Sequence, residues 1–259
     1  MSLKLYDLSL NNRLILGSAL YPSLQCFLDT IEEADIEMIT LSLKREVGSG
    51  NKNHFWNKIK QTNCKILPNT AGCRTAEEAI QIAKISREIF NTDFIKLEVI
   101  ADEYSLYPNG IELVKATKNL IDDGFKVLPY CSDDISICQA LVDHGCEVLM
   151  PLASPIGSGK GILNKYNLTL LRKRFPKSTL IIDAGLGTPS DGTIAMEMGY
   201  DGILLNSAIA LSNDPSNMAK AFNHAIKAGY LAYKAQRMPI RDHAENSTPL
   251  IDTPFWHQS

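Results

Sequence analysis

Eight short apolar segments, separated by stretches with helical spacing, are the feature of this sequence that most limits its fold. Strands that alternate with helices are typical of a parallel sheet in which every crossover is helical. We expect the strands at Arg13–Gly17, Glu37–Leu43, Lys65–Pro68, Phe94–Ile100, Lys126–Tyr130, Glu147–Pro151, Thr179–Ala184 and Gly202–Asn206.

The segments between the strands carry helix-capping residues. Ser23 is suited to the N-cap of the first helix. Thr75 opens a capping box with Glu78, and Ala79 and Ile89 fall on the apolar face of that helix. We expect the helices at Ser23–Ala34, Phe55–Gln61, from Thr75, and at Gly110–Asp123, Asp134–His144, Asn167–Phe175, Ser190–Met198 and Pro215–Ala235, with a long loop at Lys44–Asn53.

The same local pattern suits an open doubly wound sheet or a closed (β/α)8 barrel. The chain has 259 residues, which is close to the usual barrel length, and no G-x-G-x-x-G run follows the first strand. We therefore predict a single (β/α)8 TIM barrel domain of the α/β class. It comprises a short N-terminal β-hairpin at about 1–13 (from Lys4–Leu8 and Leu10–Arg13), a barrel at about 13–237 and a loosely ordered tail at about 239–259.

Composition excludes several classes of function. A net charge of −3 and a pI near 6.0 give no reason to expect nucleic acid or an anionic membrane as a partner. No apolar run is long enough to span a membrane, and Asp7 interrupts the place of a signal peptide's apolar core. The six cysteines form no C-x-x-C pair, and the histidines are isolated. We expect a cytoplasmic protein with reduced thiols and no metal.

The expected strand Phe94–Ile100 places Lys96 and Glu98 on one face, because side chains alternate along a strand. For a strand taken alone, the simplest interpretation is a weak, exposed ion pair. A strand in a parallel barrel is covered on both faces, and there a confined lysine has a lowered pKa and can attack a carbonyl to form an imine. The sequence therefore makes Lys96 a candidate nucleophile.

Three glycine-bearing loops follow the last three expected strands, where barrels commonly bind phosphate. They contain Gly157, Gly159 and Gly161, then Gly185 and Gly187, and finally Asn206-Ser207. Any one of them alone could be an ordinary turn. Together, at neighbouring strand ends, they predict a phosphate site formed by backbone N–H groups. The first is not a Walker A loop, because no Ser or Thr follows Lys160.

Asp183 ends an expected strand directly before a glycine turn. An aspartate there is commonly a turn or cap residue, but its place at the barrel mouth favours acid-base work with Glu98. We interpret Tyr130, Asp133 and Asp134 as capping and packing residues. Lys160, flanked by glycines, is the competing lysine and is better suited to contact phosphate from solvent.

Six runs along the chain carry a family resemblance. They are Pro68-Asn69-Thr70-Ala71-Gly72-Cys73, Lys96-Leu97-Glu98-Val99-Ile100, Val127-Leu128-Pro129-Tyr130, Met150-Pro151-Leu152 with Ser154-Pro155-Ile156-Gly157-Ser158-Gly159, Asp183 to Asp191, and Leu204 to Ala210. In unbroken order from about Arg13 to Arg237, the chain resembles thiazole synthase of thiamine biosynthesis. The Asn-Thr-Ala-Gly-Cys and Ser-Pro-Ile-Gly-Ser-Gly runs are the specific ones.

The resemblance implies a homo-oligomeric (dimer or tetramer) transferase that needs no cofactor. It would join 1-deoxy-D-xylulose 5-phosphate, dehydroglycine and sulfur into the thiazole phosphate, with the sulfur delivered as the C-terminal thiocarboxylate of a small sulfur-carrier protein. Lys96 would form the imine with the sugar ketone, and Glu98 and Asp183 would be the acid-base groups. The residues expected to contact the sugar phosphate are Gly157, Ala184, Gly185, Asn206 and Ser207.

The sequence departs from the family pattern at three places. Gly17-Ser18-Ala19-Leu20-Tyr21 replaces a Gly-Thr-Gly-Lys-Tyr run, Lys44-Arg45 replaces an arginine pair, and Ala101 replaces a glycine. None of these changes involves Lys96, Glu98 or the glycine loops. We therefore expect activity to survive them, and carrier docking is the property that they can alter.

Two other functions remain open on the sequence. A Schiff-base aldolase or isomerase for a different sugar phosphate would use the same lysine without a sulfur donor. A phosphate-binding barrel with a scaffolding or regulatory role would bind its ligand regardless of Lys96, and it leaves a lysine inside a strand unexplained.

Overall fold

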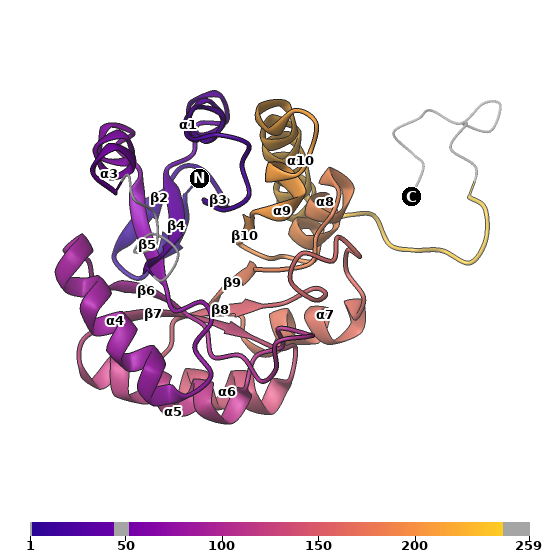
Figure 1. Cartoon of the computed structure of the whole chain (residues 1–259). Coiled ribbons are helices and arrows are strands. Elements are labelled where there is room, and N and C mark those ends of the chain that lie inside the picture. Colours follow the sequence, from indigo (N-terminus) through magenta and orange to yellow (C-terminus); the bar gives the residue numbers. More distant parts are fainter. Residues whose placement is uncertain (1, 44–51, 246–259) are drawn as a thin grey trace.

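The computed structural model describes residues 2–43 and 52–245. Within these ranges, eight parallel strands form a closed barrel in the order β10-β3-β4-β5-β6-β7-β8-β9 (Figure 1). The predicted (β/α)8 architecture is therefore confirmed. The strands of the barrel are β3 (Leu14–Gly17), β4 (Met38–Ser42), β5 (Lys65–Asn69), β6 (Phe94–Leu97), β7 (Lys126–Cys131), β8 (Val148–Pro151), β9 (Thr179–Ile182) and β10 (Gly202–Leu205).

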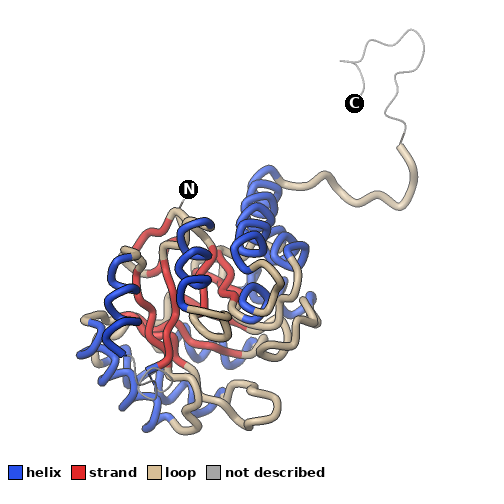
Figure 2. The backbone as a smooth tube through the Cα atoms, turned by 45° about the horizontal axis from the view of Figure 1, so that its top comes forward, coloured by secondary structure: helices blue, strands red, loops and turns tan. Residues whose placement is uncertain are grey.

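Helices surround the barrel as an outer layer, and Figure 2 shows them around the strands. In the ranges that the structure describes, none of them is both long and apolar enough to span a membrane. They are α1 (Leu24–Glu33), α3 (Lys52–Gln61), α4 (Ala76–Phe90), α5 (Gly110–Asp122), α6 (Ile135–Asp143), α7 (Lys165–Arg174), α8 (Pro189–Glu197), α9 (Ser207–Ala210) and α10 (Pro215–Ala235).

Side-chain caps fix several of these helix starts. The hydroxyl of Ser23 accepts a hydrogen bond from the N–H of Cys26 at 3.1 Å, and Thr75 accepts one from Glu78 at 3.2 Å. The second half of the predicted capping box differs, because the Glu78 carboxylate accepts from the N–H of Arg74 at 2.9 Å instead of from Thr75. Ile89 is 55% exposed, so its predicted place on the buried face of α4 is wrong.

Two expected bounds differ in the structure, one short helix was not predicted, and two expected segments lie partly outside the described residues. Strand β6 ends at Leu97, so Glu98 lies just beyond the strand. The short helix α9 after β10 was not predicted, because four residues show no periodicity. The expected loop at Lys44–Asn53 falls largely on residues outside the described ranges, and α3 already begins at Lys52. Residues 237–245 contain no helix or strand and are exposed, whereas the end of the expected tail is not described.

Successive strand residues pack into two separate cores. One core lies between the barrel and the helices and includes Ile95 and Leu97. The other fills the barrel interior, where Leu67, Leu128 and Ile181 meet. Lys96 stands between two residues of the outer core, so the alternation along β6 turns it into the barrel. This alternation places the charged side chain of Lys96 in the barrel interior.

A hairpin closes one end of the barrel. It consists of β1 (Leu3–Leu5) and β2 (Leu8–Leu10), which pair antiparallel. The predicted hairpin is confirmed, but its strand bounds are wrong: the chain turns at Tyr6, which has a φ of 53° and lies inside the expected first strand Lys4–Leu8. Leu3 and Leu5 are fully buried and pack on the interior core.

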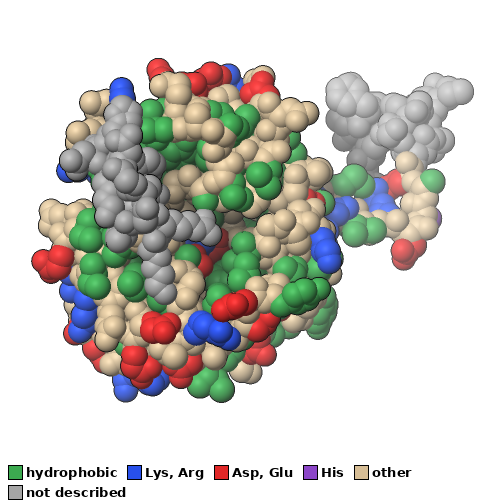
Figure 3. Space-filling view, viewed as in Figure 1, with side chains coloured by type: hydrophobic (Ala, Val, Ile, Leu, Met, Phe, Trp, Pro, Cys, Tyr) green, Lys and Arg blue, Asp and Glu red, His purple; other side chains and the backbone are tan. Residues whose placement is uncertain are grey.

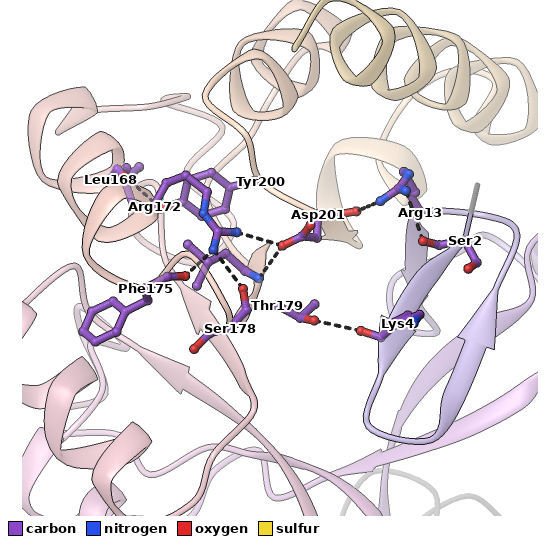
Figure 4. A network of polar contacts seen from close by, with 11 residues as sticks. Ser2, Lys4, Arg13, Leu168, Arg172, Phe175, Ser178, Thr179, Tyr200 and Asp201 are labelled. Atoms are coloured by element: carbon purple, nitrogen blue, oxygen red, sulfur yellow. Dashed lines mark hydrogen bonds and ion pairs between the residues drawn. The ribbon is translucent and has the colours of Figure 1, made fainter. Parts of the chain in front are cut away.

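A polar network ties this closed end together (Figure 4). Arg172 pairs with the Asp201 carboxylate at 3.0 Å, and Arg13 donates to the Asp201 carbonyl at 2.5 Å. The Thr179 hydroxyl donates to the Lys4 carbonyl at 2.9 Å and so joins β9 to the hairpin. Arg13, Thr179 and Asp201 lie at the beginnings of their strands, opposite the end where barrels place their active sites. The network is therefore structural.

We expect Leu5→Ala to lower the free energy of unfolding by about 2–5 kcal/mol, because it removes buried methyl groups from the closed end and leaves a cavity. Urea denaturation followed by circular dichroism measures the change. Leu231→Ala is the matched control, since Leu231 is 53% exposed and its truncation should change stability by less than about 0.5 kcal/mol. Equal effects of the two substitutions would contradict the packing of the hairpin into the barrel interior.

Candidate active site

A cavity of about 690 Å³ opens at the C-terminal ends of the strands. Its lining comes from loops after β3, β5, β6, β8, β9 and β10 and from inward side chains of β4, β5 and β6. The face drawn in Figure 3 is hollowed near its centre. Lys96, Glu98 and Asp183 all line the cavity, so the structure brings the three predicted catalytic residues into one place.

Lys96 lies between two carboxylates inside the barrel. Its Nζ is 2.7 Å from Asp183 Oδ1 and 3.3 Å from Glu98 Oε1. All three residues are buried. The interpretation of Lys96 and Glu98 as an exposed surface pair is therefore wrong, and the alternative of a lysine enclosed by a parallel barrel is confirmed.

The charge state of Lys96 differs from the one expected from sequence. Burial lowers the pKa of Lys96, and the negative charges of Asp183 and Glu98 raise it. The effect of the two charges is larger than that of burial, so the pKa lies above the usual 10.5. The predicted lowered pKa of Lys96 is therefore wrong. The reason is Asp183, which lies 87 residues away in the sequence and forms the shorter of the two ion pairs. In this state Lys96 is an ammonium ion.

Asp183 has the complementary property. Burial raises its pKa to about 7, with a further rise from the charge of Glu98 and an opposing effect of Lys96. Its Oδ2 is buried and has no hydrogen-bond partner in the described parts of the chain. A carboxyl group that titrates near neutrality and touches the lysine ammonium can take the proton that the lysine must lose before it attacks a carbonyl.

The neighbouring predicted residues have structural places. Tyr130 is buried with its ring 6.0 Å from Lys96 Nζ, and its hydroxyl donates to the Leu106 carbonyl at 3.2 Å. Asp134 caps α6 by accepting from Ser136 at 2.8 Å. Asp133 accepts a hydrogen bond from Asn164 at 2.7 Å. Lys160 is exposed and does not line the cavity, so it does not compete with Lys96.

The three glycine loops meet at one side of the cavity. Gly157 and Gly185 have φ values of 71° and 87°, which L side chains rarely adopt. A Cβ on Gly157 would lie 3.7 Å from the Ser207 hydroxyl, and one on Gly185 would overlap Ser154. Among the described residues, the backbone N–H groups of Gly157, Gly185 and Ser207 donate to no protein acceptor. Several unused donors therefore converge where the sequence predicted a phosphate.

Ala184 and Asn206, the other predicted contacts, also line this side. With its amide turned so that the nitrogen faces the loop after β3, Asn206 donates to the Ala19 carbonyl at 2.7 Å and to the Gly17 carbonyl at 3.2 Å. The Asn206 side chain therefore holds that loop.

Sequence reasoning missed the polar side chains on the opposite wall. Thr40, Ser42 and Asn69 are buried and line the cavity. The signal was present, because in register Ser42 is paired with Asn69, and Asn69 with Lys96. Register between strands is not visible in a single sequence, so the three residues did not stand out. In the described residues, no group of three or more His, Cys, Asp or Glu side chains is placed to hold a metal ion.

Comparison with known proteins agrees with this geometry. Curated thiazole synthases from Coxiella burnetii (strain Dugway 5J108-111) and Rhodopseudomonas palustris (strain BisB5) are each 52% identical to this chain, over 95% and 98% of both chains respectively. The crystal structure of the Amycolatopsis orientalis BexX/CysO complex matches 93% of this chain and 98% of the solved chain, with 26% identity and a TM-score of 0.84.

A more distant structure shares the fold alone. The 3-hexulose-6-phosphate synthase from Salmonella typhimurium is 16% identical, with a TM-score of 0.58 over 83% of this chain and 98% of that one. The family model for thiazole biosynthesis protein ThiG, in contrast, matches residues 4–249, which include the hairpin, the barrel and the charged cavity. The chain belongs to the ThiG family of thiazole synthases.

Proposed function

We propose that this thiazole synthase forms an imine between Lys96 and the ketone of 1-deoxy-D-xylulose 5-phosphate. Dehydroglycine and sulfur from a carrier-protein thiocarboxylate then complete the thiazole phosphate, so the enzyme is a sulfur-handling transferase. The observation that carries this proposal is the Lys96 amine, buried in the cavity within 2.7 Å of Asp183. An amine so placed is available to a ligand in the cavity and has a proton acceptor beside it.

The proton steps follow from the same contacts. As the ketone enters, Asp183 takes a proton from the Lys96 ammonium, and the neutral amine adds to the carbonyl carbon to give a carbinolamine. The carbinolamine oxygen must then leave as water, which requires a proton from the newly protonated Asp183 or from Glu98. Glu98, 3.3 Å from the lysine nitrogen, is also near enough to move a proton on the adjacent sugar carbon.

The glycine side of the cavity supports binding of the sugar's phosphate. The N–H groups of Gly157, Gly185 and Ser207, which donate to no acceptor in the described parts of the chain, are neutral donors on residues that line the cavity, and Ser207 begins helix α9. Because no lysine or arginine other than Lys96 lines the cavity in the described ranges, these backbone groups supply the anion contacts.

The sulfur donor is proposed to be a small carrier protein whose C-terminus enters the cavity. Exposed apolar side chains support such a contact: Ile156 and Leu211 line the cavity and are 38% and 66% exposed, and Leu20, 57% exposed, follows the lining residue Ala19. The BexX structure is solved as a complex with CysO, which supports a protein partner for this chain. Leu20 lies in the segment that departs from the family pattern, so it is where docking would differ. Assembly into a homo-oligomer stays a prediction that light scattering can measure.

Lys96→Ala is expected to abolish the covalent adduct with the sugar. The protein is incubated with 1-deoxy-D-xylulose 5-phosphate, reduced with borohydride and analysed by intact mass. The unmodified chain should gain one reduced sugar phosphate, and Lys96→Ala should gain none. Lys160→Ala is the control, because the exposed Lys160 does not line the cavity and its loss should leave the adduct unchanged. An adduct that survives Lys96→Ala would reject the imine, whereas turnover without a sulfur donor would favour the aldolase alternative.

The rate of adduct formation should rise with pH through about 7. Asp183 accepts the lysine proton only as a carboxylate, and its raised pKa of about 7 means that it is ionised above, not below, that pH. Glu98→Gln should move the midpoint to lower pH, because the Glu98 charge contributes to the raised pKa. Asp183→Asn should slow the step at least about tenfold and remove the transition. A midpoint at the same pH in Asp183→Asn would assign the transition to another group.

Gly185→Ala is expected to prevent sugar phosphate binding. Its Cβ would overlap Ser154 at a φ of 87°, so the loop must move and lose its N–H position. Gly124→Ala is a matched control, because Gly124 has a similar φ of 81° but open space around it. The control should cost only about 1 kcal/mol of stability and bind normally. Calorimetric titration with the sugar phosphate measures both, and normal binding by Gly185→Ala would place the phosphate elsewhere.

A further inference from the structure

We propose that Ser42 and Asn69 form a subsite for the carboxylate of the second small substrate, the two-carbon imino acid dehydroglycine. This inference rests on the proposed function above and names the place where one of its substrates binds. It concerns the wall of the cavity formed by β4 and β5, which has no part in the imine or the phosphate contacts.

The barrel geometry puts this wall next to Lys96. Ser42 is in register with Asn69, and Asn69 is in register with Lys96, so the three residues stand side by side on neighbouring strands. All three are buried and line the cavity. A ligand held by Ser42 and Asn69 therefore lies beside whatever is attached to the lysine nitrogen.

The same wall faces the phosphate loops across the barrel. In the strand order β10-β3-β4-β5-β6-β7-β8-β9, β4 is opposite β8 and β5 is opposite β9. A sugar phosphate with its phosphate at the loops after β8 to β10 and its ketone at Lys96 spans that side of the cavity. The side of β4 and β5 remains for the second substrate.

Ser42 and Asn69 each carry a hydrogen-bond donor that no acceptor in the described chain uses. The Asn69 amide gives one hydrogen to the Thr40 hydroxyl at 2.9 Å, and its oxygen accepts from Ala71 N–H at 3.2 Å. The second amide hydrogen of Asn69 remains. The Ser42 hydroxyl has no hydrogen-bond partner within residues 2–43 and 52–245. Both residues line the cavity, so an acceptor on a ligand held there can take these hydrogens.

The chemistry of these donors suits a small carboxylate. A carboxylate accepts hydrogen bonds at both oxygens, and a hydroxyl beside an amide N–H can serve one oxygen each. Because no lysine or arginine other than Lys96 lines the cavity in the described ranges, this wall would recognise the acid through neutral donors. The Thr40 and Ala71 contacts hold the Asn69 amide in one orientation, as a binding group requires.

Two half-reactions separate this inference from the proposed function. The full chain is first tested for the borohydride-trapped adduct with the sugar phosphate alone. Thiazole formation is then measured with the carrier thiocarboxylate while the imino acid, generated from glyoxylate and ammonia by loss of water, is varied. Ser42→Ala should keep the adduct and raise the half-saturating imino acid concentration about tenfold, because one hydrogen bond to a charged ligand is lost.

Ser42→Asp should raise that concentration at least about a hundredfold, because a second carboxylate repels the first. Ser86→Ala is the matched control: Ser86 on α4 is also a buried hydroxyl without a partner in the described chain, but it does not line the cavity, so no change is expected. An unchanged half-saturating concentration in Ser42→Ala overturns the subsite, as does loss of the sugar adduct in that variant, which would assign Ser42 to the sugar. Absence of the adduct in the unaltered protein would instead overturn the imine proposal and this inference with it.

Discussion

The contact between the Lys96 ammonium and the carboxylates of Asp183 and Glu98 is the interaction on which the site depends. A lone ammonium inside a barrel would be driven to lose its proton, and a lone carboxylate would be driven to gain one. Here each stabilises the charge of the other, with the lysine nitrogen 2.7 Å and 3.3 Å from the two acids. In the proposed chemistry, the lysine starts as a paired cation and becomes a nucleophile only when a ligand disturbs the pairing.

This arrangement changes the role of burial in the proposed chemistry. Burial alone would have activated the lysine, but the acids more than offset that effect, and the group left poised near neutrality is Asp183. Its second oxygen, buried and without a partner in the described chain, has an unfilled acceptor position in the cavity. The group whose pKa lies near neutrality is thus the Asp183 carboxyl group and not the Lys96 amine.

The barrel, its strands and most helix starts could be predicted from sequence because they depend on local signals, namely apolar runs, caps and glycines. Lys96, Glu98 and the glycine loops were also found in this way, since strand parity and strand ends are local. What depends on register was not visible. The pairing of Ser42 with Asn69 and of Asn69 with Lys96 exists only once strands are aligned, and the raised pKa of Lys96 requires Asp183 to arrive from three strands away. The turn at Tyr6 was missed because a tyrosine with positive φ is not a usual turn signal.

The hairpin at the closed end restricts how ligands enter and leave the cavity. With Leu3 and Leu5 packed into the barrel, the cavity has its entrance at the opposite end, where Ile156 and Leu211 are exposed. A protein that delivers sulfur through this entrance blocks it while it is docked. If the proposed carrier docks there, small substrates must bind before it arrives and the product must leave after it dissociates. The closed end of the barrel would in this way set the order of binding steps.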